Sequence, residues 1–191
     1  MVEIDRKLNL VVPVDRGDIK LFVHAAPLSA SVFEAYYMVI SEAFTVIYSK
    51  GLSVYAAPRI AALVLRDIAR ASGAWEGPEG VENGLVAEMH RLSNVLMPVD
   101  GKGWQTMPYA DAVARQMLSK EEQGEVEGAI VFFMVASAMH RRAELTAALG
   151  AMSLWAARLT SLNATEYAAS LRTSTPADSS GAKATASSMP R

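Results

Sequence analysis

Apolar and polar positions divide the chain into a strand-rich beginning and a helix-rich remainder. Residues 7–14 (KLNLVVPV) and 19–24 (IKLFVH) are short runs of apolar and β-branched residues, joined by Asp-Arg-Gly-Asp. Two such runs around a turn-forming connection are typical of a β-hairpin. Pro13 has no backbone N–H to give to a neighbouring strand, so we expect its arm to lie at a sheet edge or to end there.

Helical spacing begins after this hairpin. Ser31 and Glu34 match a capping box, which predicts a helix from there to Gly51. Pro58 is tolerated in a first helical turn, so it opens a second helix that stops before Gly73. Further helices are predicted over residues 85–96, from 108 to about 118, over 145–162, and from an N-cap at Asn163. Between these helices, Asp100-Gly101 separates two short extended pieces and predicts a second small hairpin within residues 95–108.

One further segment, residues 128–139 (GAIVFFMVASAM), is apolar on nearly all sides. A capping box at Ser119–Glu122 starts its helix, with acidic residues before the apolar run and basic residues after it, as the helix dipole favours. A helix that is apolar all round must be buried, by its own chain or by another copy. Its roughly 12 apolar residues fall short of the ~20 that span a bilayer. We therefore predict a central core helix or an oligomer interface.

The aromatic and methionine side chains of this region admit two interpretations. They are either internal core or a face that binds another protein, since flexible thioethers suit adaptable binding surfaces. The candidate partner-binding residues are Phe132, Phe133, Met134 and Trp155.

Composition limits the fold and the class of partner. With 191 residues, 51% of them hydrophobic, the chain suffices for one packed domain. The formal net charge of −2 gives no basic surplus for nucleic-acid binding, and the chain has no cysteine. Residues 172–191 are small and polar, which predicts a disordered tail. We predict an α+β, predominantly helical domain over residues 1–171, with the N-terminal hairpin, the second small hairpin and about six helices.

Chemistry-bearing motifs are weak throughout. The three histidines, His24, His90 and His140, lie far apart in sequence and lack metal-ligand spacing. Lys102 stands between two glycines, without the serine or threonine that a phosphate-binding loop requires. The sequence therefore predicts no catalytic, cofactor-binding or metal-binding residue. One enzymatic alternative stays open, a small helical enzyme that would use Glu88, His90 or Asp111.

Four segments of the chain resemble the tail assembly chaperones of long-tailed bacteriophages. They are the opening hairpin region KLNLVVPVDRGDIKLFVHAAPLS, GWQTMPYADAV from Gly103, EVEGAIVFFMVASAMHRRAEL from Glu125, and LWAARLTSLNATEYAASL from Leu154. The similarity covers about residues 3 to 172 and contains no catalytic motif.

This resemblance implies a non-enzymatic protein that acts during assembly and is absent from the finished particle. Its implied partners are the long helical tape-measure protein, which it would keep soluble, and the tail-tube protein, whose subunits it would recruit. It further implies a homo-oligomer in the cytoplasm of the infected bacterial host. Net charge and the length of the apolar helix predict no nucleic-acid and no membrane partner. A structural alternative shares every sequence feature, namely a minor tail or tail-completion protein that stays in the virion.

Overall fold

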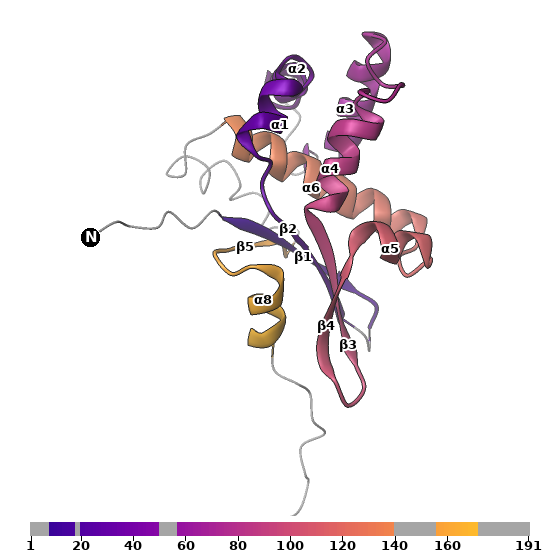
Figure 1. The fold of residues 1–191 in the computed structure, drawn as a ribbon, viewed down its shortest axis with the longest axis vertical. Helices are drawn as coiled ribbons and strands as arrows, with labels where there is room; N and C mark the ends of the chain where they lie inside the picture. The colour runs from indigo at the N-terminus through magenta and orange to yellow at the C-terminus, as the bar shows by residue number, and fades with distance from the viewer. Residues whose placement is uncertain (1–7, 18–19, 50–56, 140–155, 172–191) are drawn as a thin grey trace, which may run out of the picture.

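The centre of the fold is a five-stranded antiparallel sheet (Figure 1). The computed structural model describes residues 8–17, 20–49, 57–139 and 156–171. The strands lie in the order β4-β3-β2-β1-β5, so the last strand in the chain pairs with the first. Their bounds are β1 (Asn9–Asp15), β2 (Lys20–Ala25), β3 (Ser93–Val99), β4 (Gly103–Pro108) and β5 (Arg158–Thr160).

The predicted architecture, a predominantly helical domain with two separate small hairpins, is wrong. Both hairpins form, but β2 also pairs with β3, with Phe22 opposite Leu96, and β5 pairs with β1. Joining the hairpins satisfies backbone N–H and C=O groups that would otherwise stay unpaired along their outer strands. Such pairing between segments distant in sequence leaves no local pattern, which is why the sequence predicted hairpins and not a sheet.

The two faces of the sheet pack against different layers. Alternation along the strands places one set of side chains in the main core beneath the helices, namely Leu10, Val12, Val14, Leu21, Val23, Ala25 and Val95. The opposite face carries Phe22 and His24, both in ring contact with Tyr167 of α8 (Ala164–Ser170). The sheet is therefore covered on both sides, by the helical group at the top of Figure 1 and by α8.

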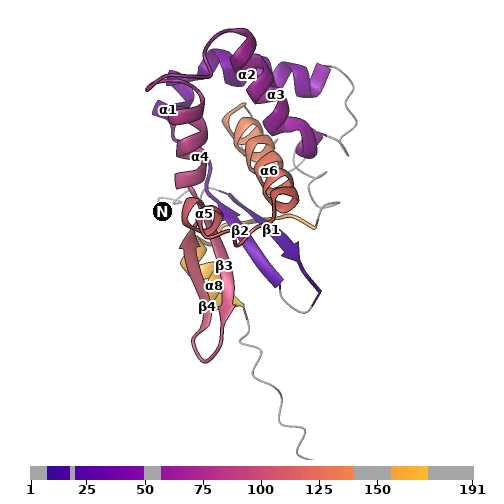
Figure 2. The ribbon, with the colours of Figure 1, turned by 90° about the vertical axis from the view of Figure 1, so that its right-hand side faces the viewer.

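The helical group contains most of the remaining elements. Its bounds are α1 (Ala30–Ala35), α2 (Tyr37–Ser49), α3 (Ala57–Ala71), the π-helical turn η1 (Glu82–Val86), α4 (Ala87–Arg91), α5 (Tyr109–Ala114) and α6 (Lys120–Met139). Helix α6 lies between α3 and the strands β1 and β2 (Figure 2). Ten of its residues, all between Val126 and Ala136, are buried, which confirms the central core helix. None of the helices in the described part of the chain combines the length and apolarity needed to cross a membrane.

Helix boundaries show where sequence signals fail and where they succeed. The capping box predicted at Ser31 does not form, because Ser29 is the N-cap and its Oγ accepts from Val32 N–H. The helix predicted to run unbroken to Gly51 is interrupted at Tyr36, where the backbone leaves helical geometry with φ −117°. By contrast, Ser119 and Glu122 bond each other's backbone N–H groups as predicted, at 3.2 and 2.7 Å. Asn163 and Glu166 do the same at the start of α8.

Two predicted helices extend into segments that are strands. The helix predicted over residues 85–96 ends at Arg91, and the following residues form β3. The helix predicted over 145–162 is wrong at its end, where Arg158–Thr160 form β5. In both places sheet pairing overrides local propensity. The start of the second helix, His140 and the predicted disordered tail lie outside the described residues.

Candidate partner-binding surfaces

The partner-binding residues predicted on α6 lie in the core. Phe132 is 2% exposed, and Phe133 and Met134 are 0% exposed. Phe132 lies beneath Tyr48 of α2, with near-parallel rings whose centroids are 6.2 Å apart. These three residues therefore offer no surface to a partner in this conformation. Trp155 lies outside the described residues.

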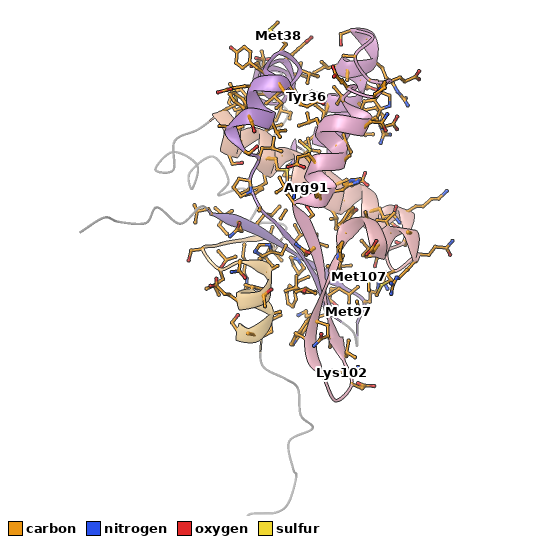
Figure 3. All side chains as sticks on the ribbon, in the orientation of Figure 1. Tyr36, Met38, Arg91, Met97, Lys102 and Met107 are labelled. Carbon is orange, nitrogen blue, oxygen red and sulfur yellow. The ribbon has the colours of Figure 1, made fainter. Side chains whose placement is uncertain are left out.

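Exposed apolar side chains gather instead on two neighbouring helices. The large hydrophobic residues that are exposed in the described part of the chain are Tyr37 (50%), Met38 (77%), Tyr48 (41%) and Leu63 (53%). The first three are on α2 and the last is on α3. Figure 3 shows Met38 projecting from α2 at the end of the molecule farthest from the β3–β4 turn. We call Tyr37, Met38 and Tyr48 the α2 apolar face.

The spacing of polar residues along α2 indicates this face. The polar residues Glu42 and Thr45 mark the outer stripe of the helix. Met38 lies one turn before that stripe and Tyr48 about one turn after it, so both continue the solvent-facing side. Because the segment is apolar almost throughout, its composition indicated a buried helix. Its periodicity would have identified the apolar residues that face water.

A groove between α3 and the first turns of α6 forms a second surface. We call it the α3–α6 groove, and its lining residues are Arg59, Ala62, Leu63 and Arg66 from α3, with Lys120, Glu121, Gln123, Gly124, Glu125 and Glu127 from α6. The α3 wall carries a formal charge of +2, and the α6 wall, with one lysine and three glutamates, carries −2. One ion pair, Arg59 with Glu125, crosses the groove.

Trp75 packs against two arginines of α3, Arg66 and Arg70, beside this groove. The guanidinium carbons of Arg66 and Arg70 lie 5.7 and 5.5 Å from the centroid of the Trp75 ring. Contact of a cation with an aromatic face is favourable, and Trp is the best such partner among the side chains. The indole is only 7% exposed, so the two arginines cover it and are held on the outer side of α3.

Polar groups also meet beside the groove, between α4, α5 and α6. His90 Nε2 lies 3.5 Å from Glu127 Oε1, and the His90 ring lies 5.0 Å from that of Tyr109, centroid to centroid. The Tyr109 hydroxyl is buried and has no hydrogen-bond partner among the described residues. Burial, with a smaller contribution from the negative charge of Glu127, raises the pKa of Tyr109. The phenol is therefore neutral and available as a hydrogen-bond donor.

The residues of the enzymatic alternative do not form one site. Glu88 is ion-paired with Arg91, whose hydrogen bonds lower the pKa of that carboxyl group. His90 faces Glu127, a partner that sequence spacing did not indicate, and Asp111 is exposed on α5. Within the described ranges, no hydrogen bond or ion pair links these three residues, and no cluster of three or more metal-ligating side chains occurs.

A separate group of polar residues attaches the segment before α8 to the sheet. His24 Nε2 and Asn9 Nδ2 both lie 3.0 Å from the backbone oxygen of Leu162. Burial lowers the pKa of His24, so the ring is neutral near pH 7 and donates this hydrogen bond through Nε2. His24 lies near the end of β2, within the second arm of the predicted N-terminal hairpin.

Comparison with known proteins assigns no family or function to the chain. No protein-family model, no curated protein and no solved structure matches the chain.

Proposed function

We propose that this chain is a non-enzymatic tail assembly chaperone of a long-tailed bacteriophage. In this role it binds the tape-measure protein in the cytoplasm of the infected host, forms homo-oligomers and helps to recruit tail-tube subunits. The sequence resemblance over residues 3 to 172 supports the proposal. The structural observation that carries it is the confinement of the exposed large apolar side chains of the described residues to α2 and α3.

The α2 apolar face has the properties that binding to a long helical client requires. A client helix presents an apolar stripe, and an exposed helix with apolar anchors can pack against that stripe. Met38, the most exposed of the three anchors, is unbranched and flexible, so it can adapt to successive turns of an irregular client. Burying one such side chain contributes about 1.5–3 kcal/mol, and several copies bound along one client add through multivalency.

The first test separates an assembly factor from a structural component. A tagged chain is recovered from phage-producing cells while purified particles are analysed by mass spectrometry. We expect a very long helical protein in the pull-down and no trace of this chain in the particles. The presence of the chain in finished particles would instead establish a minor tail or tail-completion protein.

The α2 apolar face makes a specific prediction for that pull-down. Met38→Asp places a charge where the client stripe would be buried, so we expect at least a tenfold loss of client binding. Lys102→Asp is the control, since Lys102 lies on the β3–β4 turn at the opposite end of the molecule (Figure 3). Binding is measured by titrating immobilised protein with purified client. Equal affinity for both variants contradicts a client site on α2.

A further inference from the structure

We infer that the α3–α6 groove is the surface through which two copies of this chain associate, related by a two-fold axis. The walls of the groove carry formal charges of +2 on α3 and −2 on α6. A two-fold interface applies the same patch to itself, and when the axis runs along the groove each wall meets the opposite wall of the other copy. Equal and opposite charges on the two walls make this groove complementary to itself.

Three groove charges lack an ion pair among the described residues. Arg59 is neutralised by Glu125, whereas Arg66, Lys120 and Glu121 take part in none of the ion pairs formed there. Arg66 uses the face of its guanidinium against Trp75. The N–H groups point outward in the plane of the guanidinium, so they stay available for a carboxylate. Glu121 is exposed on the first turn of α6.

The two-fold arrangement pairs Arg66 with Glu121. Rotation by 180° about an axis that runs along the middle of the groove sets α3 of one copy against α6 of the other. Arg66 then faces Glu121 of the second copy, and the same contact recurs on the other side of the axis. Each of these pairs becomes shielded from water as the groove closes, which strengthens it relative to an exposed pair.

Leu63 supplies the apolar centre of this interface. It lies between Arg59 and Arg66 on the α3 wall and is 53% exposed. On the α6 wall, Gly124 has no side chain, and an added Cβ there would meet no atom within 4 Å. Leu63 of the second copy can therefore enter the groove above Gly124 and Ala62, in keeping with the apolar centres and polar rims of protein interfaces.

Charge complementarity favours a second copy over an unrelated partner. A uniformly acidic helix would be repelled by the α6 wall, and a uniformly basic helix by the α3 wall. The inference stands on the groove alone, since the proposed client is assigned to the α2 apolar face.

Sedimentation velocity over a concentration series tests the interface. We expect a monomer–dimer equilibrium that weakens as salt rises. Arg66→Glu and Glu121→Arg should each weaken dimerisation roughly tenfold, because each creates two like-charge contacts. The double variant restores opposite charges at both contacts and should recover most of the wild-type affinity. Arg115→Glu, an exposed charge reversal on the segment after α5, is the control and should dimerise like wild type.

Either of two results overturns the inference: a wild-type chain that is monomeric at every concentration, or single and double charge reversals that dimerise equally. Glu121→Arg guards against a folding defect in Arg66→Glu, since Glu121 is exposed and its side chain forms no hydrogen bond or ion pair with the described residues. The client titration separates this failure from failure of the proposed function. A monomer that still binds the client removes the groove interface and the homo-oligomer but leaves client binding intact, and a dimer that ignores the client removes the chaperone role but leaves the groove interface intact.

Discussion

At the scale of single residues, Glu122 joins three parts of the chain. It caps α6 through the Ser119 N–H, and it accepts hydrogen bonds from the Arg16 guanidinium beyond the end of β1. Arg16 also donates to the backbone oxygen of Met117. The hydrogen bonds from Arg16 are the main cause that lowers the pKa of Glu122 from 4.5 to about 2. The cap can be predicted from four consecutive residues, Ser119 to Glu122. The contact with Arg16 cannot, because Arg16 is distant in the sequence.

This ion pair predicts a defined pH dependence of stability. The pKa of Glu122 is lower in the folded state, so its contribution is complete above about pH 4.5 and is lost as the pH falls towards about 2. Water reaches the pair, so we expect a contribution of about 1–2 kcal/mol. Urea unfolding at pH 6 and pH 3 should show a smaller loss of stability for Glu122→Gln than for wild type. Glu121→Gln, next to it, should behave like wild type, and a Glu122→Gln profile as steep as wild type contradicts this assignment.

The candidate binding residues show what a local pattern can and cannot resolve. The pattern identified Phe132, Phe133 and Met134 as unusual because their helix is apolar all round. It could not decide between core and interface, because both environments favour the same side chains. Packing decides between the two environments: α3 and the sheet cover α6, and the exposed large apolar residues of the described chain are on α2 and α3.

At the scale of elements, α3 and α6 form the most extensive helix–helix contact among the described residues. A Cβ built on Gly128 of α6 would lie 2.2 Å from the backbone oxygen of Pro58 and 3.1 Å from that of Arg59. Glycine is therefore required at this position to let the two helices approach, although it weakens an isolated helix. This contact also sets the width of the α3–α6 groove.

Two glycines of the same helix provide a matched test. Gly128→Ala forces α3 and α6 apart, and we expect it to lower the free energy of unfolding by about 1–3 kcal/mol. At Gly124 an added Cβ meets open space, so Gly124→Ala should be neutral or stabilising by up to about 1 kcal/mol. Chemical denaturation of both variants measures the difference. Equal stability of the two would show that the helices are not in close contact at Gly128.

Two of the three capping boxes predicted from the sequence form, and the box at Ser31 does not. The boxes at Ser119–Glu122 and Asn163–Glu166 depend on side chains that bond backbone within one turn, and both form. The helix predicted over residues 85–96 failed because residues 93–96 pair with β2. The competing element lies about 70 positions away in the sequence, so no local window contains it.

At the scale of the whole molecule, the C-terminal part of the domain completes the sheet. Strand β5 pairs with Asn9, Leu10 and Val11 of β1, and α8 covers the sheet face that carries Phe22 and His24. Beyond Val11, β1 has no second neighbour among the described strands, and Pro13 lies in that edge portion. The fold therefore depends on segments from both ends of residues 8–171.

Truncation tests this dependence. A chain that ends after residue 156 loses β5 and α8, so β1 becomes an open edge and the apolar face around Phe22 meets water. We expect a lower unfolding midpoint and concentration-dependent aggregation, measured by thermal denaturation and light scattering. A chain that ends after residue 172 is the control and should unfold like wild type, as the predicted domain boundary requires. Wild-type stability of the shorter chain would place β5 and α8 outside the folding unit.

The sequence by itself determined the elements whose causes lie within a few residues: the two hairpins, the capped starts of α6 and α8, and the all-apolar core helix. Turn chemistry, capping hydrogen bonds and hydrophobic periodicity act over one or two turns of chain. The tertiary structure alone decided that the hairpins join into one sheet, that Tyr37, Met38 and Tyr48 face water, and that opposite charges line the α3–α6 groove. Each of these depends on contacts between residues far apart in the sequence, where the packing of one element determines which side of another remains exposed.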